Sequence, residues 1–125
     1  FVALNPGQRI KDAKDARRTS DVDSILTAIH TYIVDQKGTT PAGLTTAEKQ
    51  LGTATTGCAI ATGGCNVTAV ACLDLSTVLV KYLKTIPVDP SGTAATTRYS
   101  AIQDSNGMVT VTACSADTPT IQSSR

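Results

Sequence analysis

"DVDSILTAIHTYIVDQKG", residues 21–38, carries the strongest periodic pattern in the chain. Large apolar residues recur in it at spacings of three and four, which places them on one face of an α-helix. Gly38 marks the end of this helix, because glycine readily adopts the left-handed backbone that closes helices. The apolar face begins at Val22, and the core residues that we expect on it are Ile25, Leu26, Ile29, Tyr32 and Ile33.

The helix extends upstream, so we expect one long helix over residues 8–37. Its first half carries only Ile10, Ala13 and Ala16 on a charged background, and residues 1–37 hold 11 of the 21 charged residues of the chain. A helix half with so little apolar surface should project into solvent or meet another subunit. The subunit-interface candidates on it are Lys11, Asp12, Lys14, Asp15, Arg17 and Arg18.

The next segment, residues 38–73, is rich in glycine and threonine and shows no sustained periodicity. A structureless loop of this length is uncommon in a compact domain unless it is functional or cross-linked. Three cysteines lie in the loop and one follows the last predicted strand: Cys58, Cys65, Cys72 and Cys114. Paired spacing typical of zinc sites is absent, so we expect disulfides, for which four cysteines allow three connectivities.

Residues 74–85 predict a short helix that Asp74 or Ser76 could cap. A junction follows it, and Pro87 and Pro90 in this junction forbid helix continuation. Asp89, between the two prolines, can accept hydrogen bonds from turn amides. The junction should therefore stop the helix and direct the chain into a strand.

Residues 98–114 predict a β-hairpin, because apolar and polar residues alternate on both sides of the turn signal Asn106-Gly107. Val109, Val111 and Ala113 should share one face of the second strand. Residues 115–125 are polar and should form a frayed tail. The whole chain, residues 1–125, then reads as a single α+β domain in which the helix packs on a small antiparallel sheet.

Composition excludes several classes of function. The net charge is +1, with no broad basic surplus for nucleic acid, and aromatic residues make up only 3% of the chain. His30 is the only histidine, and no motif ties it to a nucleophile. The turn "DSNG" at residues 104–107 lacks the closing acid of a calcium loop. We therefore expect no catalytic site, no metal and no cofactor.

The stretch "NVT" at residues 66–68 matches a glycosylation sequon, which is used only where the matching machinery exists.

The order of these elements resembles the soluble part of a bacterial type IV pilin, or of its relative, the major pseudopilin of type II secretion. Three stretches carry the resemblance: residues 1–38, "YLKTIPVDPSG" at residues 82–92, and "YSAIQDSNGMVTVTA" at residues 99–113. The middle loop adds nothing to it. Pilins begin with an apolar helix segment that contains a glutamate. The given sequence lacks it, and we interpret the apolar run at residues 1–4 as the tail of such a segment.

The resemblance implies a structural subunit that assembles with copies of itself into a type IV pilus. It implies an inner-membrane anchor before assembly, a methylated N-terminus in the full-length protein, a pilus assembly machinery as partner and a place on the cell surface. Adhesion, twitching motility or DNA uptake would follow at the level of the filament. It also favours a disulfide from Cys114 to the loop. The alternatives are a pseudopilin of a secretion or competence system and a secreted adhesin module that does not polymerise.

Overall fold

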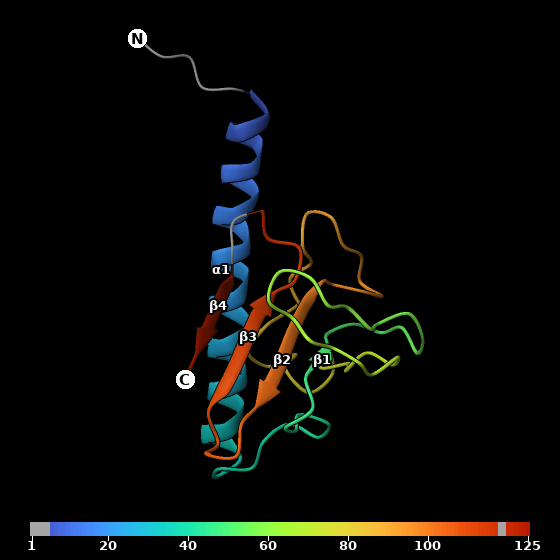
Figure 1. Ribbon diagram of the computed structural model, residues 1–125. Helices are drawn as coiled ribbons and strands as arrows, with labels where there is room; N and C mark the ends of the chain where they lie inside the picture. Colours follow the sequence, from blue (N-terminus) through green and yellow to red (C-terminus); the bar gives the residue numbers. More distant parts are fainter. Residues whose placement is uncertain (1–5, 118–119) are drawn as a thin grey trace.

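The computed structural model describes residues 6–117 and 120–125, and it has one helix packed on a four-stranded antiparallel sheet. Helix α1 spans Pro6–Asp35 and comes first, and the strands follow in the order β1-β2-β3-β4 across the sheet (Figure 1). This is the α+β arrangement expected from the sequence. The apolar run at residues 1–4 lies outside the described residues.

Helix α1 begins and ends where the sequence chemistry places its boundaries. Pro6 occupies the first helical position, where its missing N–H costs no hydrogen bond. At the other end Lys37 and Gly38 adopt positive φ values of 56° and 94°, and the Gly38 N–H donates to the Ile33 carbonyl at 2.8 Å. This closure satisfies a carbonyl that the helix leaves unpaired. The predicted helix over residues 8–37 is therefore confirmed, with bounds shifted by two residues.

The predicted hairpin is confirmed as β2, Tyr99–Gln103, and β3, Val109–Ala113. Their antiparallel register pairs Tyr99 with Ala113 and Ala101 with Val111. The side chains of these four residues are buried against α1. Strand β1 is short, Lys49–Gln50, and pairs with β2 at one edge of the sheet.

The predicted frayed tail is wrong, because Ile121–Ser124 forms strand β4 beside β3. The pairing is extended by two backbone hydrogen bonds that Val109 and Arg125 exchange at 2.7 and 2.9 Å. Ile121 packs against the core, and the Arg125 side chain reaches Asp23 on α1 at 3.0 Å. Only Ile121 of the four strand residues is apolar, so the sequence carries no alternation that would indicate a strand.

The predicted short helix over residues 74–85 is also wrong, because this segment forms successive turns. Two helix-like hydrogen bonds occur, from Leu79 to Leu75 at 2.9 Å and from Leu83 to Leu79 at 2.8 Å, but they do not continue into an α-helix. β-branched residues, which disfavour helices, interrupt the segment. Its apolar residues still serve the expected purpose, since Leu75 and Leu79 are buried in the core.

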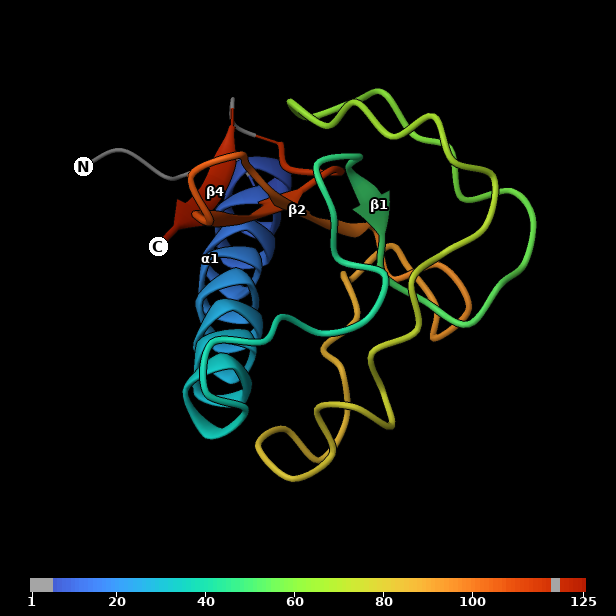
Figure 2. The same cartoon turned by 90° about the horizontal axis from the view of Figure 1, so that it is seen from below.

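The core lies between α1 and the sheet. Ile25, Leu26 and Ile29 are fully buried, whereas Tyr32 and Ile33 are partly buried at its edge. The remaining segment between β1 and β2 is irregular and lies to one side of α1, as Figure 2 shows from below. No helix among residues 6–117 and 120–125 has the length and hydropathy needed to cross a membrane.

Candidate functional site

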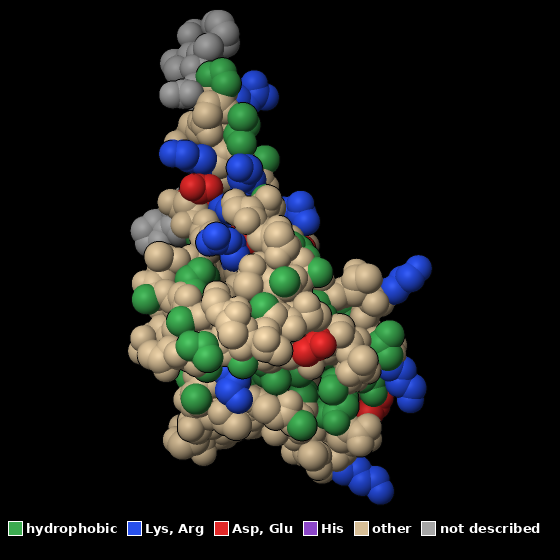
Figure 3. Space-filling view, turned by 90° about the vertical axis from the view of Figure 1, so that its right-hand side faces the viewer, with side chains coloured by type: hydrophobic (Ala, Val, Ile, Leu, Met, Phe, Trp, Pro, Cys, Tyr) green, Lys and Arg blue, Asp and Glu red, His purple; other side chains and the backbone are tan. Residues whose placement is uncertain are grey.

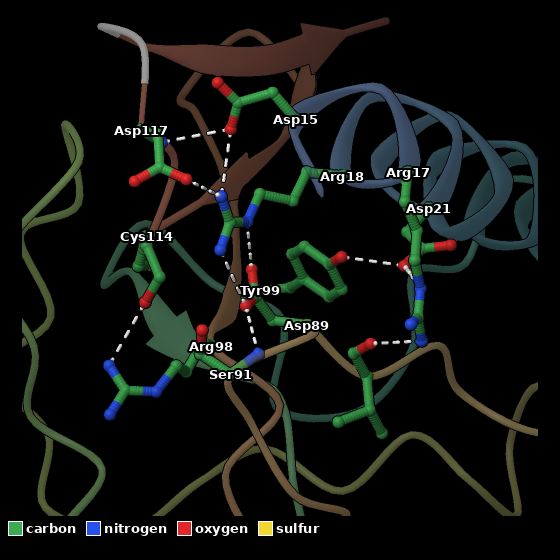
Figure 4. Close-up of polar contacts among 12 residues, drawn as sticks. Asp15, Arg17, Arg18, Asp21, Asp89, Ser91, Arg98, Tyr99, Cys114 and Asp117 are labelled. Carbon is green, nitrogen blue, oxygen red and sulfur yellow. Dashed lines mark hydrogen bonds and ion pairs between the residues drawn. The ribbon is translucent and has the colours of Figure 1, made fainter. Parts of the chain in front are cut away.

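A buried arginine on α1 organises the junction between the helix and the rest of the chain. Arg18 is 2% exposed, and its Nε and Nη2 donate to the two carboxylate oxygens of Asp89 at 2.7 and 3.2 Å. Its Nη1 donates to Asp15 and to Asp117, each at 2.9 Å. Figure 4 shows the guanidinium enclosed by these three carboxylates. One side chain thus joins the helix, the proline junction and the segment after Cys114.

The sequence Asp89-Pro90-Ser91-Gly92 shapes the junction so that it can receive Arg18. The Gly92 N–H donates to the Asp89 carbonyl at 2.8 Å and closes a four-residue turn. Pro90 is the second residue of this turn, a position at which the fixed φ of proline is favoured. The Asp89 carboxylate also accepts the Ser91 N–H at 2.7 Å, as the sequence predicted. A Cβ at Gly92 would lie 2.8 Å from the Thr97 carbonyl oxygen, so the close approach of the two backbone segments requires glycine here.

The cluster binds its cation firmly. The hydrogen bonds that Arg18 donates to Asp89, and then to Asp15 and Asp117, raise the pKa of Arg18 above its ordinary value, against the opposing effect of burial. A bidentate arginine–carboxylate pair is the geometry with the strongest and most directional contact. Asp15 also accepts the Asp117 backbone N–H at 3.0 Å. The arrangement fixes three chain segments in one geometry and offers no group poised for chemistry.

A second set of contacts involves Arg17 and Asp21, which flank Arg18 on α1. The Tyr99 hydroxyl donates to Asp21 at 2.7 Å, and Arg17 donates to the Val88 carbonyl at 3.0 Å. Arg17 also approaches Asp21 at 3.6 Å. Burial first, and then the hydrogen bond to Asp21, raises the pKa of Tyr99. The junction is therefore bound to α1 by the adjacent residues Arg17 and Arg18, and β2 is bound to Asp21 through Tyr99 (Figure 4).

The predicted assignment of Asp15 and Arg18 to a subunit surface is wrong, because their side chains are 11% and 2% exposed and bind within the chain. The signal that could have revealed this lies in the spacing. Arg18 precedes Val22, Ile25 and Ile29 by four, seven and eleven residues, so it lies on the apolar face of the helix. A charged residue on such a face needs a partner of opposite charge, and in the structure that partner is Asp89 between its two prolines.

The first turns of α1 present a different surface. Arg9, Ile10, Lys11 and Asp12 are exposed, and Lys14 is half-buried. Ile10 is 56% exposed, which is high for a large apolar side chain. Asp12 accepts a hydrogen bond from Gln8 at 2.8 Å, while Arg9, Lys11 and Lys14 enter no ion pair within the described part of the chain. This part of α1 extends beyond the sheet (Figure 1).

Two disulfides confirm the prediction that the cysteines are oxidised. Cys58 pairs with Cys72 inside the irregular segment, and Cys65 pairs with Cys114 at the end of β3. The second bond holds the loop over the sheet face that points away from α1, where Ser100 is buried. The pairing of Cys114 with the loop agrees with what the resemblance favoured.

The remaining predicted features occupy ordinary structural positions. His30 Nε2 lies 2.9 Å from the Arg125 carbonyl oxygen, and no nucleophile is bonded to it in the described residues. The Asp104 carboxylate accepts the Asn106 and Met108 amides at 2.8 and 2.9 Å, which is the bonding of a hairpin turn. Asn66 of the sequon is exposed. Across residues 6–117 and 120–125, no cluster of three metal-binding side chains occurs.

No family model matches this chain, and no curated protein or solved structure matches it either.

Proposed function

We propose that this chain is the globular part of a type IV pilin-like subunit, which acts by packing with copies of itself into a filament at the bacterial cell surface. The observation that carries the proposal is the first part of α1, residues 6–14, which extends beyond the sheet and contributes no fully buried side chain. A helix segment of nine residues is marginal alone and gains stability from packing. A neighbouring subunit can supply that packing.

The kind of contact also matters. A projecting helix on one copy must dock on a different surface of the next copy, and such head-to-tail contacts generate open filaments when the rotation does not close. Exposed Ile10 offers an apolar side chain for this contact, with Ala13 beside it on the same face. Small and apolar residues permit close approach of helices, while the surrounding charges set the register of the contact.

The buried cluster around Arg18 supports the same function. In a filament held together by helices, the part of each subunit that follows α1, called its head here, has to remain attached to its own helix. Arg18 binds Asp89 and Asp117, which lie 71 and 99 residues away in sequence, and so fixes distant parts of the head to α1. The two disulfides restrain the irregular segment further. These features suit a protein that works by mechanical packing without turnover of a substrate.

The test compares two exposed apolar side chains at opposite ends of α1 in the full-length protein. Ile10→Glu should abolish or strongly reduce surface filaments seen by electron microscopy, because it places a charge in the subunit contact. Val34→Glu is the matched control, since Val34 is 75% exposed near the other end of the helix. Both variants should unfold within about 0.5 kcal/mol of the parent chain.

Normal filaments in the Ile10→Glu strain would overturn the packing role of this segment. Unchanged filaments after deletion of the whole gene would overturn the assignment as the filament's main subunit. A host that shows secretion defects but no surface filaments would favour the pseudopilin alternative.

A further inference from the structure

We propose that Arg9, Lys11 and Lys14 form a cationic collar around α1 that binds the anionic head groups of a phospholipid bilayer. The inference rests on the proposed function, because the pilin resemblance implies that the subunit is held at a membrane before it assembles. It adds a specific contact surface and the chemistry of the partner to that proposal. Three observations carry it: the unpaired state of these cations, their distribution around the helix and their height along it.

The three cations are not neutralised by the acids of residues 6–117 and 120–125. Arg9 and Lys11 are exposed, Lys14 is half-buried, and no ion pair engages them among the described residues. The single acid between them, Asp12, is held by Gln8 at 2.8 Å. Of the next charges along the helix, Asp15 and Arg18 are buried in the ionic cluster, and exposed Arg17 lies 3.6 Å from Asp21. The projecting part of α1 therefore presents a net positive surface, and Figure 3 shows Lys and Arg side chains on both of its flanks.

The cations surround the helix. At about 100° per residue, Lys11 lies roughly 160° around the axis from Arg9, and Lys14 lies roughly 60° beyond Lys11, on the side away from Arg9. No single face of the helix therefore holds all three. A nucleic acid lying along the helix, or one neighbouring subunit, would contact only part of this collar. A surface that the helix enters end-on contacts the whole of it.

The length of the collar along the helix axis matches the thickness of the head-group layer of a bilayer. Five residues separate Arg9 from Lys14, which corresponds to a rise of about 7.5 Å along the helix. The polar layer on each side of a bilayer is about 5–8 Å thick, taken as half the difference between its total and hydrocarbon thicknesses. In sequence, the apolar residues 1–4 precede the collar, on the side where the hydrocarbon region would begin. Lysine and arginine next to an apolar segment are the residues that anionic lipids attract.

The experiment measures how the 125-residue chain partitions onto vesicles by flotation. Vesicles of equal parts phosphatidylglycerol and phosphatidylcholine should bind the chain at low ionic strength, whereas pure phosphatidylcholine vesicles should not. Each neutralised cation should lower the partition coefficient about fivefold, so the triple variant R9Q/K11Q/K14Q should lose about 100-fold. About 0.5 M salt should release the parent chain, because it screens the attraction.

A matched control removes the same charge elsewhere. The variant K37Q/K81Q/K84Q neutralises three exposed lysines in other parts of the molecule and has the same net charge as the collar variant. It should retain most of the vesicle binding. Thermal unfolding checks that both variants fold as the parent does.

Equal losses in the two variants would overturn the collar and leave only a general charge effect. Failure of the parent chain to bind anionic vesicles would overturn it as well. Tighter binding to duplex DNA than to the vesicles, sensitive to the same three cations, would assign the surface to nucleic acid instead. Flotation requires no filament, so its outcome is separate from the Ile10→Glu experiment.

Discussion

The two halves of helix α1 belong to one continuous element but are stabilised by different interactions. Its second half places Val22, Ile25 and Ile29 against the sheet, where all three are at most 1% exposed. Among its described residues, the first half contributes none to the buried apolar core, and polar contacts of Asp15, Arg17 and Arg18 bind it to the rest of the chain. The second half is therefore stabilised by apolar burial, and the first by directional polar contacts centred on Arg18, beyond which the helix projects.

The two kinds of interaction differ in what they fix. Apolar packing is non-directional and tolerates small adjustments, so it suits the permanent core. A buried ionic cluster contributes less net stability than its contacts suggest, but it fixes a geometry, because its partners must remain in place. Residues 6–14, beyond the cluster, remain available for contacts with other molecules.

Removing the central cation should produce the largest effect. Arg18→Met keeps much of the side-chain volume but leaves three carboxylates without their partner, so the free energy of unfolding should fall by about 3–5 kcal/mol. Arg17→Met is the control, because the Arg17 side chain is 58% exposed and its loss should cost at most about 1 kcal/mol. Urea unfolding of both variants measures the difference. Equal losses would show that the buried cluster does not bind the first half of α1 to the head.

Truncating the apolar core should have a similar or smaller effect. Ile29→Ala leaves a cavity between α1 and the sheet and should cost about 2–5 kcal/mol. Ile10→Ala removes the same atoms from an exposed site and should stay within about 0.5 kcal/mol. A large loss of stability at Ile10 in the isolated chain would contradict the distinction between the two halves.

The two disulfides should differ in their contribution. Cys65–Cys114 closes a loop with a sequence separation of 49, whereas Cys58–Cys72 has a separation of 14. The chain-entropy model then gives the longer loop about 1 kcal/mol more stabilisation. Unfolding of the paired alanine variants measures this directly. The opposite order would mean that local packing of the irregular segment outweighs loop length.

The smallest of these effects on stability is expected for the Tyr99–Asp21 contact, which alkaline pH can test. The folded protein raises the pKa of Tyr99 above its unfolded value of about 10, so this group contributes stability that is fully present below about pH 10. That contribution is lost as the pH rises from about 10 towards the higher pKa of the folded state. Tyr99→Phe should cost about 1 kcal/mol at neutral pH and flatten the decline above pH 10. An unchanged decline would place its origin at another group.

The sequence predicted the elements whose signal is periodic and apolar. The helix face around Ile29, the hairpin around Asn106-Gly107 and the oxidised cysteines could all be read from local pattern. Strand β4 was missed because three of its four residues are polar, and its position is set by pairing with β3. Residues 74–85 carry apolar residues at the spacing of a helix, which is why the sequence predicts one there. The structure shows that successive turns can bury Leu75 and Leu79 at that same spacing.

The ionic cluster was the main feature that local patterns did not reveal. The Asp89 turn was correctly expected, but its partner lies 71 residues away, and a charge pattern along one helix does not identify such a partner. The position of Arg18 on the apolar face was the only available signal. The projecting first half was expected from its lack of apolar residues, and what it contacts stays a proposal.

If residues 10–14 of α1 are left free for contacts outside the chain, amide hydrogen exchange will distinguish them from the rest of the helix. Exchange would be measured along α1 in the isolated chain and in filaments isolated from the native host. We expect rapid exchange at residues 10–14 and slow exchange from Val22 onward in the isolated chain, and we expect residues 10–14 to exchange slowly in filaments. Slow exchange at residues 10–14 in the isolated chain, or exchange there that filaments leave unchanged, would contradict this expectation.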